Sequence, residues 1–557
     1  MTTLRRRRAS GPLPLILSLI PLLTACTRPP LTVAERSGFR ETAAADQVED
    51  FIRQLDRQAP LITTTSLGTS AEGRPIPLLI LADPPVTPEA TRPPDQRMVI
   101  LMFGNIHAGE VCGKEALLML ARDLALQHPH HRVLDNFILC FAPLYNIDGN
   151  ERFGPDNRPG QVGPDRMGTR ANAQGLDLNR DYVKLDAPES RALVDFLNRW
   201  DPAIIVDTHT TNGSHHRYVL TYQGPKHPAG DPRVIELVRE RMLPAIGRAF
   251  EAQTGWNAFF YGNFADDHTR WTTYPAEPRY GVAYRGMRNR LSILTEAYAY
   301  APYEDRVRAT FAFCNEILDW AAANASIIRT VIRSADDAQP LLAQQGAPVV
   351  LRTQAVPFTD PVTVLGYEEY DDQGRLPEPG APRDYTVAFV NDFAPLESVS
   401  RPLAYAIPAS LESVVDHLEL HGVQVVRLDE PLDVSVERSR VLDLTHTATP
   451  YGGRRRVEEI TVSSRPGEET LPADTWIVRL DQPLGTLAAY LLEPRATDGL
   501  TAWGFLDDHL APGEDYPILR IRSDVFSELN RRDQAARAQD QSHAGMPTSR
   551  SPSNDRR

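Results

Sequence analysis

Cysteine and positive charge are both scarce in this chain. Only four of its 557 residues are cysteines, which excludes a fold held together by a framework of disulfides. The formal net charge is −14, and this argues against nucleic-acid binding, because that function needs a basic surface. Hydrophobic residues make up 42% of the chain and charged residues 24%, so an ordinary globular fold is expected.

The first residues have the pattern of a secretion signal. Four arginines at positions 5–8 precede an apolar run from Leu13 to Leu23, which is too short to span a bilayer. The run ends in the letters LTAC at Cys26. That ending resembles a bacterial lipobox, in which the cysteine becomes the lipidated first residue of the mature protein. The alternative is an ordinary signal that is cleaved nearby, with Cys26 incidental.

The residue after the lipobox adds an expected location. Thr27 follows Cys26, and in diderm bacteria a lipoprotein without Asp at this position is usually sorted to the outer membrane. We therefore expect an exported protein of the cell envelope, anchored by lipid at Cys26 on the periplasmic side of the outer membrane.

The length of the chain predicts two or three structural units. Strand-like and helix-like segments alternate up to about residue 335, and short strand-like runs dominate beyond it. The C-terminal end is polar and rich in Arg, Ser and Gln, as disordered segments are. The expected units are a lipoprotein signal peptide (1–26), a linker (27–45), a catalytic domain (46–335), a smaller strand-rich α+β domain (336–530) and a disordered tail (531–557).

Within the first large unit the pattern predicts an α/β fold. Apolar runs of strand length at 97–103, 203–209 and 291–296 alternate with helical segments such as 114–126 and 189–200. This order is typical of a mainly parallel mixed sheet with helices on both faces.

Polar residues that can bind a metal or transfer a proton lie at the ends of three of these strands or just after them. His107 and Glu110 lie in the turn after the first, and His209 and Glu296 end the other two. Because sites in open α/β sheets form beyond the carboxyl ends of the strands, we expect these side chains to meet at one edge.

Three of these residues form a possible zinc site. H-x-x-E occurs often by chance, but His107, Glu110 and His209 together supply the three protein ligands of a catalytic zinc, which keeps a fourth position for water. His215 and His216 are rival ligands. His209 is favoured over them because it is fixed at a strand end.

The segment Asp177-Leu178-Asn179-Arg180 supplies a second candidate site. An Arg beside an Asn can hold a substrate carboxylate through a bidentate, charge-assisted contact. Asp177 can accept the free N–H of a metal-bound histidine. By itself the segment is also compatible with a solvated charged loop.

From about residue 45 to 330 the chain resembles the zinc carboxypeptidase A family of metallopeptidases. The order, spacing and strand context of several motifs carry the resemblance. They are GTSAEGRPI at 68–76, His107-Ala108-Gly109-Glu110, Asn146-Ile147-Asp148-Gly149, Arg170-Ala171-Asn172, Gly175-Leu176-Asp177-Leu178-Asn179-Arg180, Asp207-Thr208-His209 and Leu294-Thr295-Glu296.

The resemblance implies a role for each matching position. It implies one zinc ion per chain, a peptide substrate with a free C-terminal carboxylate and hydrolysis of the C-terminal peptide bond. The matching residues are His107, Glu110 and His209 as zinc ligands, Glu296 as general base, Arg170 at the scissile carbonyl, Asn179 and Arg180 at the terminal carboxylate, and Asp177 behind His107.

Three positions depart from the family pattern or have no secure match to it. Gly109 stands where the digestive enzymes of the family carry an Arg. The mobile active-site Tyr has no secure match: Tyr274 lies at the most suitable distance from Glu296 in the sequence, and Tyr280 and Tyr284 are rivals. The residue that sets the side-chain preference, near Gly281, is also unassigned.

Two other functions remain open from the sequence. One is a peptidoglycan hydrolase, an endopeptidase or amidase of stem peptides that uses the same zinc chemistry. The other is a non-catalytic binding protein on the same fold, which the complete set of ligands plus Glu296 disfavours. The sequence gives no oligomeric state and no role for the C-terminal domain.

Overall fold

A computed structural model describes residues 28–523, apart from residues 88, 129–130, 372–373 and 376–378. The expected signal peptide, the lipidation site Cys26 and the expected tail 531–557 lie outside the described residues. Within the described residues, no helix is both long and apolar enough to cross a membrane.

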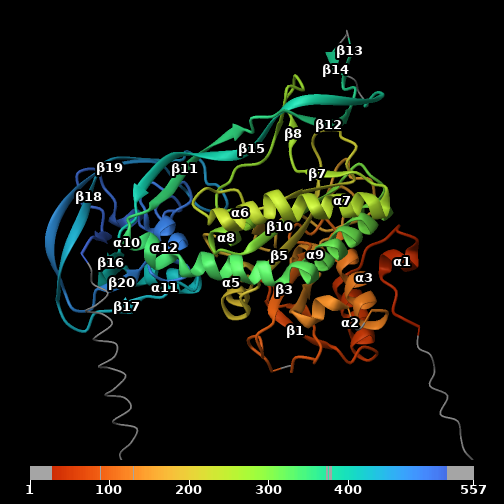
Figure 1. Ribbon diagram of the computed structural model, residues 1–557, viewed down its shortest axis with the longest axis horizontal. Coiled ribbons are helices and arrows are strands. Elements are labelled where there is room, and N and C mark those ends of the chain that lie inside the picture. The colour runs from red at the N-terminus through yellow and green to blue at the C-terminus, as the bar shows by residue number, and fades with distance from the viewer. Residues whose placement is uncertain (1–27, 88, 129–130, 372–373, 376–378, 524–557) are drawn as a thin grey trace, which may run out of the picture.

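An eight-stranded mixed sheet forms the centre of the first large unit (Figure 1). The order is β1-β2-β4-β3-β5-β10-β6-β7. The four central strands, β4, β3, β5 and β10, run parallel, while β2 and β6 flank them in the antiparallel sense. The strands are β1 (Ile62–Thr69), β2 (Pro75–Leu81), β3 (Met98–Gly104), β4 (Phe137–Ala142), β5 (Ile204–Thr211), β6 (Leu220–Gln223), β7 (Ala258–Phe260) and β10 (Leu291–Tyr298).

Helices cover both faces of this sheet, as the sequence predicts. Successive residues of a strand point to opposite faces. Thr208 of β5 faces Gly113, where an added Cβ would lie 1.9 Å from its Oγ1. Its neighbour Asp207 accepts a hydrogen bond from Arg285 on the other face. Gly113 belongs to α3 (Cys112–Leu126) and Arg285 to α8 (Gly281–Met287), so these two helices lie on opposite sides.

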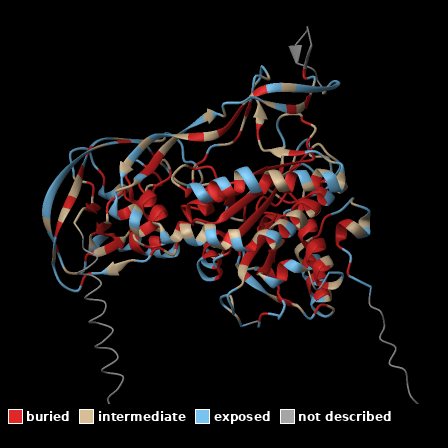
Figure 2. Ribbon diagram, viewed as in Figure 1, coloured by how far each residue is buried: buried red, intermediate tan, exposed pale blue. Residues whose placement is uncertain are grey.

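Burial explains why the central strands form where they do. All six residues of β4 are buried, as are six of the seven residues of β3 (Figure 2). Continuous apolar runs of this kind are typical of parallel strands covered on both faces. Further helices of this unit are α4 (Ile147–Asn150), α5 (Pro188–Trp200), α6 (Pro232–Glu236), a π-helical segment (Leu237–Met242), α7 (Leu243–Thr254) and α9 (Tyr303–Asp337).

The prediction of a linker over residues 27–45 is wrong for the part of that segment which the structure describes. Residues 33–37 form helix α1 (Val33–Ser37), and α2 (Ala45–Asp56) begins at the end of the segment. The buried carboxylate of Glu115 accepts hydrogen bonds from Thr42 Oγ1 and from the backbone N–H groups of Ala34 and Ala43. The segment is held by distant side chains of α3, since Lys114 also donates to Ala43 O and Arg122 to Pro30 O. No local sequence pattern reveals these contacts.

The region after α9 is rich in strands, as predicted. It contains a six-stranded sheet in the order β17-β20-β16-β21-β18-β19. Its elements are α10 (Gln339–Gln344), β11 (Pro348–Pro357), β12 (Val362–Tyr367), β13 (Tyr370–Asp371), β14 (Gly374–Arg375), β15 (Pro382–Ser400), β16 (Ala404–Ile407), α11 (Glu412–Leu420), β17 (Val426–Arg427), β18 (Leu432–His446), β19 (Val457–Leu471), β20 (Trp476–Arg479), α12 (Gly485–Leu492) and β21 (Leu519–Ile521).

This C-terminal region is joined closely to the first unit. β15 pairs with β9 (Arg270–Thr272), which in turn pairs with β8 (Asn263–Phe264), so one sheet contains strands of both regions. One continuous hydrophobic core also includes residues of both, such as Tyr284 and Leu418. Figure 1 shows α11 and α12 between the first unit, at the side where α5 and α8 lie, and the strands β18 and β19 at the end of the molecule.

Candidate active site

Strand register brings the predicted residues to one edge of the sheet. β5 and β10 are parallel neighbours in which His209 pairs with Glu296. β3 pairs with the other side of β5 and ends at Gly104, opposite Thr208. The turn that follows β3 carries His107 and Glu110 and leads into α3.

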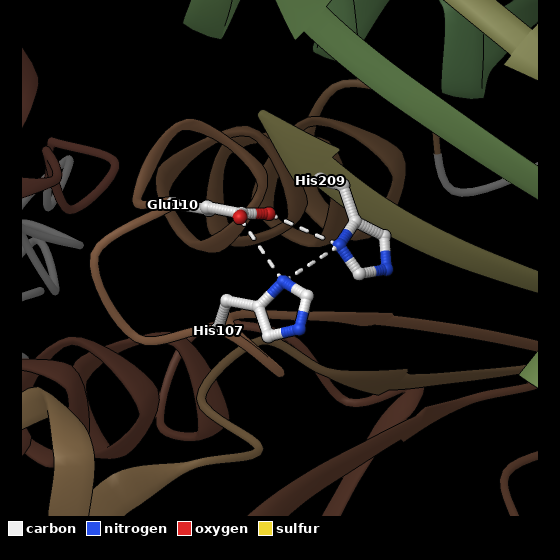
Figure 3. A group of neighbouring side chains, drawn as sticks. All are labelled: His107, Glu110 and His209. Atoms are coloured by element: carbon white, nitrogen blue, oxygen red, sulfur yellow. Dashed lines mark hydrogen bonds and ion pairs between the residues drawn. The ribbon is translucent and has the colours of Figure 1, made fainter. Parts of the chain in front are cut away.

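The side chains of His107 and Glu110 in this turn converge with that of His209 on β5 (Figure 3). The Nδ1 of His107 lies 3.0 Å from Glu110 Oε1, and the Nδ1 of His209 lies 3.0 Å from Glu110 Oε2. The two Nδ1 atoms are 3.2 Å apart. All three side chains are buried. Donors of a tetrahedral zinc, each about 2.0–2.2 Å from the ion, have similar separations.

The partners of the two imidazoles show why a cation fits here. The Nε2 of His107 lies 3.1 Å from Asp177 Oδ1, and the Nε2 of His209 lies 3.0 Å from Asp207 Oδ1. Each Nε2 therefore faces a carboxylate, the arrangement that orients metal-bound histidines. Both Nδ1 atoms face each other and the Glu110 carboxylate. Two imidazole nitrogens and a carboxylate oxygen at these separations fit zinc.

Glu296 shares the cavity with this cluster. The cavity has a volume of about 190 Å³, and His107, Glu110, His209 and Glu296 all line it. Burial raises the pKa of the Glu296 carboxyl to about 8; the charge of Glu110 adds to this effect and that of His209 opposes it. Its Oε2 is buried and has no hydrogen-bond partner among the described residues. A carboxyl group in this state is suited to gain and release a proton.

Part of the cavity wall is basic. The guanidinium of Arg180 donates to Asn179 O and lies 4.3 Å from the ring centre of Tyr280. Within the described residues it forms no ion pair, which leaves its outer face for an anionic ligand. Arg170 also lines the cavity, and its Nη2 lies 2.9 Å from Asp177.

The structure separates the three candidate tyrosines. Tyr274 and Tyr280 both line the cavity. Tyr284 is buried elsewhere, where its hydroxyl lies 2.7 Å from His421 Nδ1. Tyr274 and Tyr280 therefore both remain candidates for the active-site tyrosine, and Tyr284 is excluded because it does not line the cavity.

The rival ligands also lie apart from the metal cluster. Of the described residues, only His107, Glu110 and His209 meet as a possible metal-binding group. The His216 ring packs against Tyr298, with the ring centres 4.2 Å apart.

Two charged groups at the site were missed in the sequence. Asp207 faces the Nε2 of His209 from two positions earlier on β5, a spacing that places both side chains on the same face of a strand. The period of two could have revealed it. Arg158 lies in the long Gly- and Pro-rich loop after β4, where no periodicity marks any residue.

Arg158 occupies the space above Gly109. A Cβ at position 109 would lie only 2.6 Å from Arg158 Cγ. The guanidinium reaches Glu110, with Nη1 3.0 Å from Oε1, and its Nη2 donates to Thr210 O at 2.9 Å. The N–H of Thr210 donates to the other Glu110 oxygen at 2.9 Å. Both oxygens of this ligand are thus held in place.

We expect Arg158→Ala to weaken zinc binding by about 10- to 100-fold, the usual effect of removing a group that orients a metal ligand. Competition with a chromophoric chelator measures the affinity. Arg166→Ala is the control, because Arg166 lies in the same loop but contacts only Phe153 O among the described residues. Equal affinities of the Arg158→Ala and wild-type proteins would contradict this role.

Comparison with known proteins agrees with the geometry. The family model described as zinc carboxypeptidase matches residues 48–278. Carboxypeptidase 2 of Trichophyton tonsurans is 24% identical over 503 residues, covering 86% of each chain. Rat carboxypeptidase D is 35% identical over 160 residues, which cover 24% of this chain and 12% of that protein.

Among solved structures, a metallo-carboxypeptidase from Burkholderia cenocepacia is similar at 18% identity, with a TM-score of 0.38, over 50% of this chain and 70% of that one. The family match covers the turn and the strand that carry His107, Glu110 and His209, and it ends before β10, which carries Glu296. The chain therefore carries a domain of the zinc carboxypeptidase family, and the protein is a zinc metallopeptidase.

Proposed function

We propose that the protein removes C-terminal residues from peptides in the cell envelope. The observation that carries this proposal is the position of Arg180. Its guanidinium lines the same small cavity as the metal cluster and Glu296, and forms no ion pair within the described residues. A peptide whose terminal carboxylate binds Arg180 and Asn179 places its last peptide bond toward the cluster.

Each residue then has a defined task. Bound zinc would act as a Lewis acid and lower the pKa of a coordinated water toward about 7. Glu296 takes a proton from the attacking water and delivers it to the leaving amine. Arg170 donates hydrogen bonds to the carbonyl oxygen as negative charge develops on it. Asp177 and Asp207 keep the two histidine rings in the orientation that ligation requires.

Glu296→Gln should bind zinc normally but lose activity by about 100-fold or more, because an amide cannot accept the proton. Zinc content by elemental analysis and hydrolysis of a peptide with a free C-terminus are the two readouts. Hydrolysis at the wild-type rate would remove Glu296 from the role of base.

Arg180→Ala should raise the KM for peptides with a free α-carboxylate by about 100-fold, the scale of a lost charge-assisted contact. The KM for matched C-terminally amidated peptides should change little. Equal effects on both substrates would point to an endopeptidase, and purified muropeptides then become the substrate to test.

The envelope location rests on the N-terminal sequence, which ends its apolar run at Cys26. Full-length protein expressed in a diderm bacterium should incorporate a labelled fatty acid and sediment with the outer membrane. Cys26→Ser should lose the label and leave the membrane fraction. Unlabelled wild-type protein, or a labelled Cys26→Ser variant, would contradict lipid attachment at this residue.

A further inference from the structure

The two segments that form the basic wall of the cavity both rest on the C-terminal region. One segment continues from Arg180 to about residue 187, and the other runs from about residue 277 into α8. They are joined at the cavity, because the N–H of Gly281 donates to Asn179 Oδ1 at 3.0 Å and the Tyr280 ring packs on Arg180.

Asp498 holds the second segment. This residue follows α12 and is completely buried. Its Oδ2 accepts hydrogen bonds from the backbone N–H and the Nε of Arg279, at 3.0 and 2.9 Å. Its Oδ1 lies 3.4 Å from the Nη2 of Arg456. Arg279 directly precedes Tyr280, so the carboxylate fixes the backbone from which the tyrosine ring projects.

Three further contacts hold the first segment. The carbonyl oxygen of Val183 lies 2.8 Å from the Nε2 of His417 and 3.1 Å from that of His421. Both histidines lie at the end of α11. Asp186 accepts two hydrogen bonds from the guanidinium of Arg454, at 2.6 and 3.0 Å. These contacts follow Arg180 by only three to six residues.

The contact between the C-terminal region and the two wall segments is polar, so it does more than bury apolar surface. A buried charge is costly unless it is paired and hydrogen-bonded. Well-packed apolar residues in place of a buried ion pair often stabilise a fold equally well. Directional hydrogen bonds to the backbone of residues 183 and 279 instead fix the positions of the two segments. Those positions set the distance between Arg180, Asn179 and Tyr280.

We propose that the C-terminal region positions the carboxylate-binding wall of the active site, with Asp498 as the positioning residue for Tyr280 and Arg180. This role rests on the proposed carboxypeptidase function. It gives the C-terminal region a part in substrate binding, although none of its residues lines the cavity among those described.

The test measures KM and kcat for a peptide with a free C-terminus in Asp498→Ala, together with the zinc content. We expect the KM to rise about tenfold, equivalent to about 1.4 kcal/mol of lost carboxylate binding. The kcat should stay within about twofold and zinc should remain at the wild-type level, because the metal cluster is untouched. Asp498→Asn should show a smaller rise, since its amide oxygen still accepts the N–H of Arg279.

Two further variants separate positioning from general stability. Arg279→Met removes the guanidinium half of the same pair and should raise KM by a smaller factor, because the N–H of residue 279 still donates to Asp498. It keeps the test valid should Asp498→Ala not fold. Glu493→Gln is the matched control: Glu493 is equally buried and paired with Arg520 in the same region, but has no contact with the wall. It should lose stability with an unchanged KM.

An unchanged KM in both Asp498→Ala and Arg279→Met, or an equal rise in Glu493→Gln, would overturn the proposal. Wild-type and Arg180→Ala proteins are assayed in parallel on free and amidated peptides. If wild-type protein does not prefer the free carboxylate, the carboxypeptidase function fails and this inference fails with it. If it does, an unchanged KM in the variants rejects the inference alone.

Discussion

The site depends on one constraint: two imidazole nitrogens and a carboxylate meet within 3.2 Å in a buried place. Three donors at these separations match the ligand set of a tetrahedral zinc. The surrounding residues make the arrangement specific. Asp177 and Asp207 face the far side of each ring, and Arg158 and Thr210 hold the two oxygens of Glu110.

The cavity divides into a reactive half and a recognition half. The metal cluster and Glu296 form the first, on the carboxyl ends of central strands, which burial holds rigid. Arg180, Asn179 and Tyr280 form the second, on loops whose backbone is supported by the C-terminal region. Loops carry specificity well only when something fixes them.

Local patterns predicted the part of the site that the sheet builds. Apolar runs located the strands that carry His209 and Glu296, because a parallel sheet places such residues at one edge. Long-range contacts could not be predicted in the same way. Arg158 reaches Glu110 from an irregular loop, and Glu115 holds the segment expected as a linker. The support of Arg279 by Asp498 joins residues more than 200 positions apart. Nothing in either local sequence indicates these pairs.

Anomalous diffraction at the zinc absorption edge tests the central claim most directly, on crystals of protein purified without added metal. The account predicts one strong peak about 2.0–2.2 Å from the Nδ1 atoms of His107 and His209 and from an oxygen of Glu110, on the side that faces Glu296. A protein that crystallises without metal at this position, or binds zinc through His215 or His216 instead, would contradict the account.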